Sequence, residues 1–386
     1  MPERSIEGGL TRADEVPEKR EAAPPASRLT RKPIGLALQG GGSWGAYTWG
    51  VLDAVLASRT LGIAQLSGTS AGAINAAIVA SALAKGTVKD ARDRLRSFWL
   101  GIAQPAAADL GREVWGPVER AWRDTIQGWL VSGSALSPYT ANPLGINPLR
   151  AAIEKHVDID AIRSRDAPAL FVTVTNVKTG LPRVVANDAI TIDVLLASAA
   201  LPQLFQAVEI DGEPYWDGGY SGNPTLWPMI HGGLAPDLLV VQLVPDTEAQ
   251  TPTDAPAIRR RIGEIVFNSS LVAEMQAIAA MRALSANDGD ASHVHAVRLH
   301  RIGPPSRALL ADGSSLERSH AWISRLHRAG RAAARSFVAR HGRDVGVRET
   351  LDIARVFGGP HKPKLRRPAN EPAFDDAATP SAMAAR

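Results

Sequence analysis

Three consecutive glycines, Gly40, Gly41 and Gly42, separate a short apolar run from a longer segment with helical periodicity. The apolar run covers residues 34–38, and the periodic segment extends to about residue 58. This order predicts a strand, a tight glycine turn and a helix. Because glycine has no side chain, the amides of such a turn can approach a ligand closely. The rest of the sequence must indicate what they hold.

Two phosphate-binding motifs are candidates for this turn. Gly40, Gly42 and Gly45 match the G-x-G-x-x-G pattern of dinucleotide-binding turns, although a lone match has low specificity. A P-loop is excluded because no Gly-Lys-Ser/Thr follows. The next strand, expected at residues 63–67, ends without the acidic residue that holds a dinucleotide ribose.

That strand runs instead into Gly68-Thr69-Ser70-Ala71-Gly72, which matches the nucleophile-elbow pattern G-x-S-x-G. The elbow is a sharp turn between a strand and a helix, here expected at residues 71–84, and it exposes the serine hydroxyl above the sheet. On its own this five-residue pattern is more often an ordinary Gly/Ser-rich turn.

The glycine turn and the serine turn are more informative together than separately. Parallel strands end at the same edge of a sheet, so the glycine turn and Ser70 are expected to lie side by side there. Acyl transfer places negative charge on a carbonyl oxygen, which backbone amides can stabilise as an oxyanion hole. Gly40, Gly41 and Gly42 would supply those amides.

A nucleophilic serine needs a base, and two residue types are available. Asp217, in Trp216-Asp217-Gly218-Gly219, follows a short strand and is the better candidate, although on local sequence alone it could be a turn aspartate. A pair at His293 and His295 would share one face of an expected strand, as metal ligands might, but no third ligand is nearby. No histidine stands in a recognisable motif; the nine are His156, His231, His293, His295, His300, His320, His327, His341 and His361.

The composition is that of a globular protein. The chain has 386 residues, 45% of them hydrophobic, and a formal net charge of +4, too small to indicate a nucleic-acid partner. The absence of cysteine excludes disulfides, thiol catalysis and cysteine-ligated metals. No signal peptide and no apolar run long enough to cross a bilayer is present, so we expect a cytoplasmic protein.

The two ends differ from the middle of the chain. Residues 1–33 and 358–386 lack apolar periodicity and are expected to be disordered tails around one α/β hydrolase domain, residues 34–357. Alternating elements and continuous apolar runs predict a doubly wound, mostly parallel sheet. Further strands are expected at residues 170–177, 181–186, 208–210, 214–216, 238–244 and 294–301, and further helices at residues 87–103, 148–156, 190–200, 256–286 and 317–341.

The motifs GGGSWG, GTSAG and DGG, in this order and spacing, resemble those of the patatin-like phospholipase family. The segments NPLRAAIEKHVDID and ASAALPQLFQAVEIDGEPYWDGG, and Asn223-Pro224 beyond them, resemble the same family. The resemblance covers about residues 33–244 and implies a three-layer α/β/α sandwich. One position departs from the family pattern G-G-G-x-[RK]-G: Trp44 replaces the cation, and is either a core residue or part of an acyl-chain wall.

The resemblance also implies a mechanism. Ser70 would be the nucleophile and Asp217 its base, with no catalytic histidine, an oxyanion hole at Gly40, Gly41 and Gly42, and neither cofactor nor metal. The chain would be a lipid acyl hydrolase of the phospholipase A or carboxylester hydrolase type that works through an acyl-enzyme. The alternatives are acyl transfer to an alcohol, a non-catalytic lipid-binding scaffold of the same fold, and a dinucleotide-binding oxidoreductase.

Two other segments have open interpretations. Residues 104–147 carry Trp115, Trp122 and Trp129 and form either a buried helix face or a cap over an acyl pocket. Residues 318–343 are rich in arginine and contain no acidic residue, which fits either a solvated helix face or peripheral contact with an anionic membrane. The sequence leaves the oligomeric state open.

Overall fold

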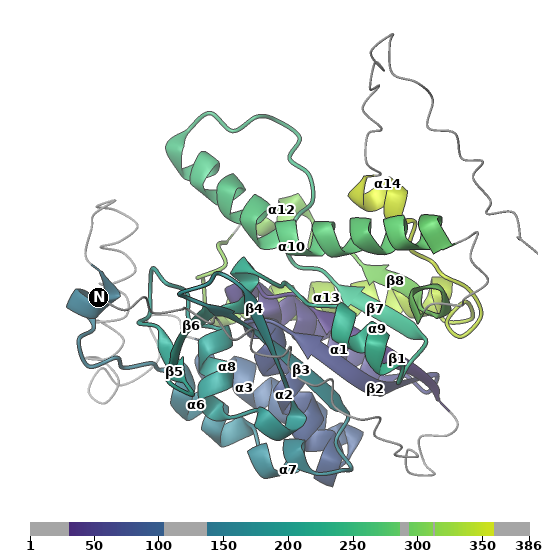
Figure 1. Cartoon of the computed structure of the whole chain (residues 1–386), viewed down its shortest axis with the longest axis horizontal. Coiled ribbons are helices and arrows are strands. Elements are labelled where there is room, and N and C mark those ends of the chain that lie inside the picture. The colour runs from purple at the N-terminus through teal and green to yellow at the C-terminus, as the bar shows by residue number, and fades with distance from the viewer. Residues whose placement is uncertain (1–30, 104–136, 286–292, 312, 359–386) are drawn as a thin grey trace, which may run out of the picture.

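The computed structural model describes residues 31–103, 137–285, 293–311 and 313–358 (Figure 1). The candidate cap up to residue 136, with its three tryptophans, lies outside these residues. The predicted tails also lie outside them, except for residues 31–33, where a strand begins, and residue 358. The strands are β1 (Lys32–Leu38), β2 (Leu61–Gly68), β3 (Ala169–Asn176), β4 (Pro182–Ala186), β5 (Val208–Ile210), β6 (Glu213–Asp217), β7 (Asp237–Val241) and β8 (Arg298–Ile302).

These eight strands form one sheet in the order β5-β6-β3-β2-β1-β7-β8, with β4 paired to β3. The central strands β3, β2, β1, β7 and β8 are parallel, whereas β4 and β6 pair antiparallel with β3. Leu38 lies between Gly68 and Val241, so β1, β2 and β7 end at the same edge.

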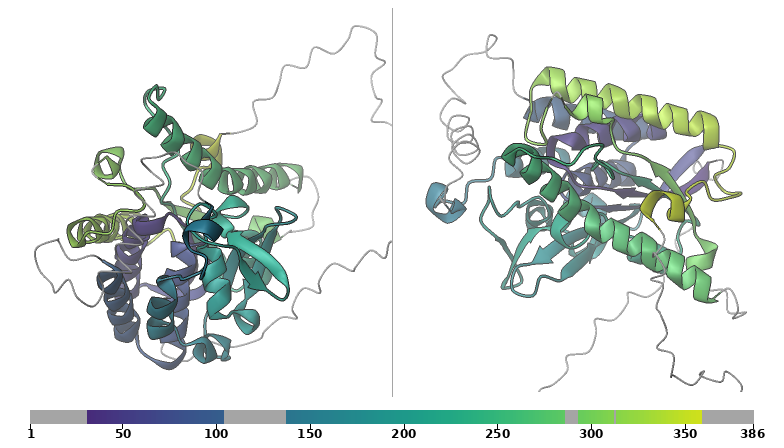
Figure 2. Two further views of the ribbon diagram at one scale, coloured as in Figure 1. Left: turned by 90° about the vertical axis from the view of Figure 1, so that its left-hand side faces the viewer. Right: turned by 90° about the horizontal axis from the view of Figure 1, so that it is seen from above.

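The apolar runs of the central strands are divided between two cores. In β1, Leu36 and Leu38 pack into one core, and Ala37 between them packs into the other. In β7, Leu238 and Val240 face the side of Ala37, and their neighbours face the opposite side. Helices α1, α2, α3, α8 and α13 cover one face of the sheet, and α9, α10 and α14 cover the other (Figures 1 and 2). The predicted α/β/α sandwich with a mostly parallel sheet is therefore confirmed.

Most predicted helices are present within a few residues of their expected bounds. The α-helices are α1 (Gly45–Ala57), α2 (Ala71–Lys85), α3 (Val88–Ile102), α5 (Pro138–Ala141), α6 (Leu149–His156), α7 (Ile159–Arg163), α8 (Ile192–Ser198), α9 (Trp227–Gly232), α10 (Ala255–Ser285), α11 (His293–Ala296), α12 (Arg307–Leu310), α13 (His320–His341) and α14 (Ile353–Phe357). Short 3-10 turns lie at η2 (Gly42–Trp44), η3 (Asn187–Ala189) and η4 (Gly218–Tyr220). No helix in the described part of the chain has both the length and the apolar character needed to cross a bilayer.

One predicted strand is wrong over half its length. His293 and His295 lie in the helical turn α11, and the strand β8 begins only at Arg298. The two histidines therefore do not share a strand face. Within the described residues, no three His, Asp or Glu side chains are grouped as metal ligands.

Helices α1 and α13 pack at close range because glycines occupy their interface. A Cβ atom on Gly330 of α13 would lie 1.9 Å from the Tyr47 carbonyl oxygen, and one on Gly50 of α1 would lie 2.1 Å from the His327 carbonyl oxygen. The buried carboxylate of Asp53 on α1 is paired with Arg331 of α13 at 3.3 Å. Because α1 starts directly after the glycine turn, this packing also fixes the position of that turn.

We expect Gly330→Ala to destabilise the fold, because its methyl group would overlap backbone; overpacking of a core typically costs about 1–3 kcal/mol. The matched change Gly263→Ala lies in an exposed part of α10 with nothing within 4 Å of the new methyl group. It should stabilise by roughly 0.8–1 kcal/mol through helix propensity. Urea unfolding of both variants measures the difference, and equal stability of Gly330→Ala and the wild type would contradict the interface described here.

Candidate active site

The glycine turn and the serine turn lie side by side at the carboxyl edge of the sheet. A Cβ atom added to Gly40 would lie 2.7 Å from the Cβ atom of Ser70 and 2.7 Å from the Thr69 carbonyl oxygen. No larger residue fits at that point without displacing the serine turn. The two motifs that the sequence places 30 residues apart are therefore in contact.

Ser70 has a backbone conformation that is unfavourable for residues other than glycine, with φ 55° and ψ −125°. Its amide donates to the Ser198 hydroxyl at 2.9 Å, and that hydroxyl donates to the Thr173 carbonyl oxygen at 2.8 Å. The neighbouring Gly72 approaches β1 so closely that a Cβ atom would lie 2.2 Å from the Leu38 carbonyl oxygen. Such strain, worth about 1–3 kcal/mol, persists where the surroundings impose it and is concentrated at functional sites.

Strand pairing brings Asp217 to the same point. Strand β4 pairs with one edge of β3, along residues of β3 that also pair with β2 or with β6. Both β2 and β6 must therefore pair with the opposite edge of β3. Along that edge, β3 pairs with β2 up to Val172 of β3. Its pairing with β6 starts at Val174, which lies opposite Asp217, the last residue of β6. The antiparallel β6 thus ends facing the carboxyl end of β2, which continues into Ser70.

The Asp217 side chain is fully buried, and only one of its oxygens is bonded. Oδ1 accepts the Gly219 amide at 2.7 Å, whereas Oδ2 has no hydrogen-bond partner among the described residues. Burial raises the pKa of Asp217 to about 7, against the lowering effects of the Gly219 amide and the Ser70 hydroxyl. Ser70 is thus close enough to act on this carboxyl group, although no hydrogen bond of ordinary geometry joins the two side chains.

The glycine turn offers two free amides, not three. The Gly40 amide donates to the Asn223 side-chain oxygen at 2.6 Å, so the expectation that Gly40 supplies a donor to a substrate does not hold. The Gly41 and Gly42 amides make no hydrogen bond to another described residue. Gly40 is needed for its close approach to Ser70.

Asn223 is a further residue of the site. The sequence indicated it only through the resemblance of Asn223-Pro224 to a family motif, and gave no role for its side chain. It is fully buried, and its side-chain nitrogen donates to the Phe267 carbonyl oxygen at 3.0 Å. Its backbone amide donates to the Ser270 hydroxyl at 3.0 Å. One carboxamide therefore joins the glycine turn, the loop after Asp217 and helix α10.

A segment far along the chain supports the glycine turn from behind. The Ser43 amide donates to the Ser315 carbonyl oxygen at 2.7 Å, and the Trp322 indole donates to the Ser43 hydroxyl at 3.3 Å. Gly42 has φ +57°, and a Cβ atom there would lie 2.3 Å from the Ser315 carbonyl oxygen. Trp44 lies in the hydrophobic core and is 7% exposed.

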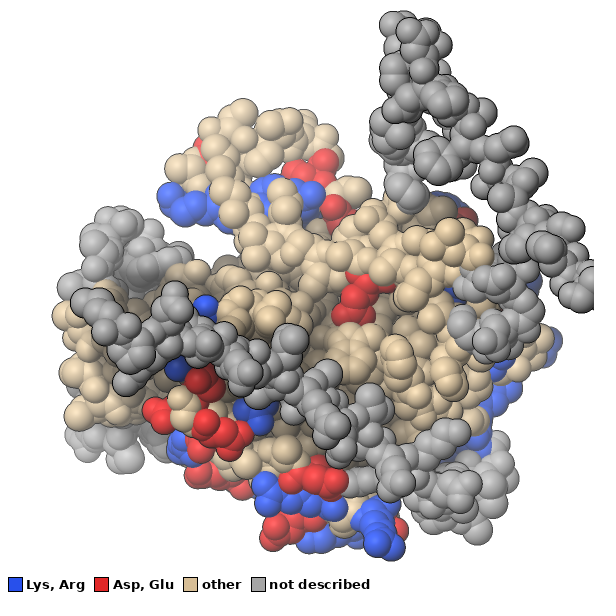
Figure 3. Space-filling view, in the orientation of Figure 1, with Lys and Arg blue, Asp and Glu red and all other residues tan. Residues whose placement is uncertain are grey.

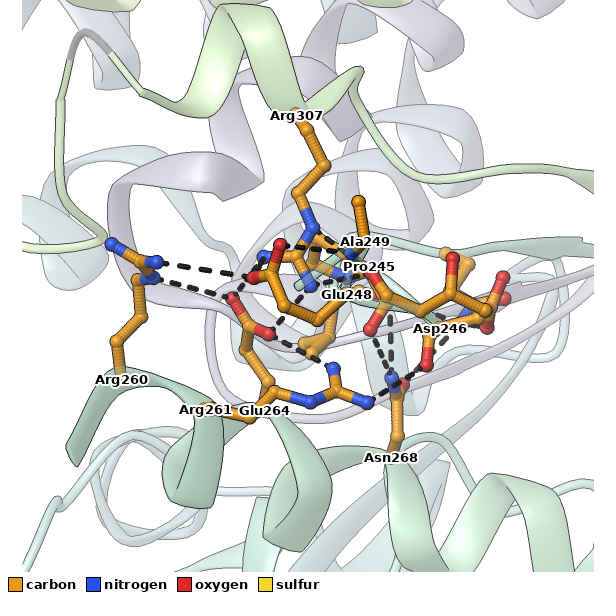
Figure 4. Close-up of polar contacts among 12 residues, drawn as sticks. Pro245, Asp246, Glu248, Ala249, Arg260, Arg261, Glu264, Asn268 and Arg307 are labelled. Carbon is orange, nitrogen blue, oxygen red and sulfur yellow. Dashed lines mark hydrogen bonds and ion pairs between the residues drawn. The ribbon is translucent and has the colours of Figure 1, made fainter. Parts of the chain in front are cut away.

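An ion-pair network fixes the first half of α10 beside this edge (Figure 4). Glu264, almost fully buried, accepts from Arg261 at 3.0 Å and from Arg307 at 2.7 Å. Arg261 also donates to the Asp246 carbonyl oxygen at 3.1 Å, just beyond β7. The network thus ties α10 to the loop after β7 and to α12.

No hydrogen bond joins Ser70 to a histidine within the described residues. Five histidines have other partners. His156 bonds to Ala152 and Ser97, His231 bonds to Trp227, and His300 bonds to Thr350 and Asp237. His327 is paired with Asp53, and His341 is paired with Asp344. His361 lies outside the described residues. The Ser70 hydroxyl, in turn, is among the groups that lower the pKa of Asp217.

Comparison with known proteins gives a match to one family and to distant solved structures, two of which are VipD and ExoU. A family model described as patatin-like phospholipase matches residues 36–230, half of the chain. The crystal structure of VipD from Legionella pneumophila has a TM-score of 0.37 and 15% identity, covering 81% of this chain and 67% of that chain. The crystal structure of the type III effector protein ExoU has a TM-score of 0.34 and 16% identity, covering 80% of this chain and 53% of that chain, so this chain spans about half of ExoU. No curated protein matches.

The raised pKa of Asp217 predicts a pH effect on stability. Between about pH 4 and pH 7 the unfolded carboxyl group ionises while the buried one stays protonated, so the folded state binds more protons and stability falls as pH rises. Asp217→Asn removes this loss. Its unfolding free energy relative to the wild type should therefore rise across that range by several kcal/mol, since one pKa unit corresponds to about 1.4 kcal/mol.

Asp53→Asn is the matched control. Burial raises the pKa of Asp53, but hydrogen bonds from His327 and Arg92 outweigh it and hold the pKa at about 2. Its contribution is complete above about pH 4, so the stability of Asp53→Asn relative to the wild type should stay level from pH 4 to pH 7. Urea unfolding at each pH measures both variants. If the difference in stability between Asp217→Asn and the wild type is also constant from pH 4 to pH 7, Asp217 is not protonated in the folded state.

Proposed function

The chain belongs to the patatin-like phospholipase family, and on this basis we propose that it is a serine-dependent lipid acyl hydrolase of the phospholipase A or carboxylester hydrolase type. The observation that carries the proposal is the strained Ser70 turn beside a buried Asp217 with one unpartnered oxygen. A buried carboxylate oxygen without a donor is costly, and a proton transferred from the serine would satisfy it.

In the proposed reaction Ser70 Oγ attacks the ester carbonyl carbon while Asp217 Oδ2 accepts the hydroxyl proton. The amides of Gly41 and Gly42 donate to the resulting oxyanion, and the N-terminus of α2 adds partial positive charge. The C–O bond then breaks, the alcohol leaves with the proton from Asp217, and Ser70 is left acylated. Water attacks this acyl-enzyme, Asp217 accepts its proton and returns it to Ser70, and the carboxylic acid leaves.

The other expectations remain proposals. Peripheral contact with an anionic membrane fits a lipid substrate, and the cytoplasmic location is a prediction from the sequence. Acyl transfer to an alcohol would use the same acyl-enzyme, and a scaffold without activity would keep the fold alone. A soluble p-nitrophenyl ester tests the proposal: hydrolysis supports the hydrolase, and its absence with intact folding favours the scaffold.

The nucleophile and base are tested together. A fluorophosphonate probe should label Ser70, and mass spectrometry should find the adduct in the peptide that contains GTSAG. Asp217→Asn should lower kcat about as far as Ser70→Ala, and the double variant should be little worse, because residues that act as a unit are non-additive. In the wild type, kcat/KM should fall below about pH 7 as Asp217 becomes protonated.

Each outcome has a clear opposite. An adduct on another serine would remove Ser70 from the mechanism. A folded His→Ala variant that still binds substrate and loses as much kcat as Ser70→Ala would make that histidine the base. The pH dependence of kcat/KM alone would not distinguish Asp217 from a histidine, since an unperturbed imidazole has a pKa of about 6.5.

The oxyanion hole is tested at Gly41. An alanine Cβ there would lie 3.4 Å from Leu243 Cβ, an ordinary contact, so Gly41→Ala should fold. Alanine keeps the backbone amide, but its Cβ atom narrows the approach of a substrate oxygen to that amide. The loss should therefore approach that of one donor, typically about 2.7–4 kcal/mol, or roughly 10²–10³ in kcat. Gly42→Ala is a poorer probe, because positive φ and overlap with Ser315 should lower its stability first. Full kcat in a stable Gly41→Ala would contradict a close approach of the substrate oxygen to this amide.

A further inference from the structure

The exposed face of helix α10 is unusual for a helix at a protein surface. Ile258, Ile262 and Ile265 follow one another at spacings of four and three, so they form one stripe, and they are 40%, 55% and 53% exposed. No exposed position of α10 carries an acidic side chain; those positions are Ala255, Pro256, Ile258, Arg259, Arg260, Ile262, Gly263, Ile265, Ser269, Ala273, Ala277, Ala280, Met281, Ala283 and Leu284. A surface helix normally shows charged and polar residues on its outer face.

Other amphipathic helices of the same chain follow the usual rule. The exposed face of α3 carries Lys89, Asp93 and Arg96. Helix α13 exposes Arg328 and Arg335, and its apolar residues, among them Trp322, Leu326 and Phe337, are buried against the domain. The arginine-rich helix singled out in the sequence thus has charge but no free apolar side, whereas α10 has both.

The stripe lies on a helix that is held rigidly from its inner side. Glu264, Asn268, Leu271 and Met275 of α10 are buried, and the ion pairs of Figure 4 fix its first half. Seen from above, α10 crosses the molecule in front of the sheet (Figure 2, right). In Figure 3 much of the surface along α10 is tan, with blue and red side chains grouped beside its first half, where the ion pairs lie.

We propose that this face of α10, the isoleucine stripe with Arg259 and Arg260 beside it, docks on the surface of a membrane that contains anionic lipids. The inference rests on the proposed function, because a lipid hydrolase must reach its substrate at such a surface. Isoleucines enter the boundary between headgroups and acyl chains, while the Arg259 guanidinium binds phosphate. Arg260 beside it already lies 3.9 Å from the carboxylates of Glu248 and Glu264, so Arg259 is the stronger headgroup ligand of the two. The face is the outer side of a helix and not a groove, which suits a flat lipid surface.

A second copy of the chain fits this face less well. Two copies meeting through the stripe would bring Arg259 and Arg260 of both chains together with no exposed acidic residue of α10 to pair with them. Arg259 has no ion-pair partner among the described residues, and an anionic headgroup would supply one.

The same helix also touches the candidate active site. The Phe267 carbonyl oxygen and the Ser270 hydroxyl of α10 hold Asn223, and the Phe267 ring lies 2.4 Å from where a Cβ atom of Gly219 would be. Docking through α10 would therefore set the distance between the lipid surface and the loop that carries Asp217.

Co-sedimentation of the full chain with phosphatidylcholine vesicles, with and without phosphatidylserine, tests the surface. Ile262→Ser with Ile265→Ser should weaken binding to both vesicles about tenfold or more, because apolar contact is lost. Arg259→Glu should weaken binding about tenfold to the anionic vesicles alone and reduce its salt dependence. All three positions are exposed, so the variants should unfold at the wild-type temperature.

Matched controls lie elsewhere on the surface. Leu181→Ser removes an apolar side chain that is 65% exposed, and Arg328→Glu makes the same charge change on α13; both should bind as the wild type does. Unchanged binding by the double isoleucine variant would overturn the proposal, as would an equal loss in Leu181→Ser. An equal loss in Arg328→Glu would move the membrane face to α13.

Two further measurements separate this inference from its rivals. If the wild type sediments as a dimer and the double isoleucine variant as a monomer, the face joins two copies and the proposal fails. The double variant should hydrolyse a soluble p-nitrophenyl ester at the wild-type rate and vesicle phospholipid more slowly. A wild type that hydrolyses the soluble ester without binding vesicles would refute the docking face alone. Vesicle binding through α10 without any hydrolysis would refute the proposed function alone.

Discussion

A buried carboxyl group with an unbonded oxygen is the constraint around which this domain is arranged. Water would satisfy Asp217 Oδ2 in an unfolded chain, so its burial is unfavourable and the surrounding fold must impose it. The loop that carries it is held at several points: Thr175 donates to the Asp217 carbonyl oxygen at 2.8 Å, and Thr69 donates to the Gly222 carbonyl oxygen at 2.6 Å. These hydroxyls come from β3 and from the serine turn. The elements that position Ser70 therefore also position Asp217.

The local parts of this site could be predicted because each is encoded in a few adjacent residues. The glycine turn after β1 and the serine turn after β2 follow from apolar runs that end in glycines, and their meeting follows from the parallel pairing of those strands. The parts that depend on distant pairing could not be predicted in the same way. Asn223 and Ser315 contact the glycine turn from positions whose own sequence carries no sign of a partner.

The error at His293 and His295 has the same origin. Alternation across residues 294–301 is compatible with a strand, but a strand needs a neighbouring strand edge to pair with. Strand β7 has five residues, and these pair with β8 from Arg298 to Ile302. The residues before Val297 have no strand beside them, so the first part of the alternating segment closes a helical turn. Periodicity identified the strand, and the length of its neighbour set where it begins.

The electrostatics of the site follow from burial of Asp217 with no cation acting on its pKa. At the position of Trp44 the family pattern has a cation, whereas this chain buries an indole and has no cation among the groups that act on the Asp217 pKa. Burial is then opposed only by one amide and one hydroxyl, which is why the carboxyl group titrates near neutrality and not in the usual acidic range. In the proposed reaction, negative charge on the reacting oxygen would likewise be stabilised by backbone dipoles, which are the two free amides and the N-terminus of α2. In the proposed mechanism the site therefore depends on the conformation of its two turns more than on any charged side chain, and the glycines that permit those turns would matter as much as Ser70 and Asp217.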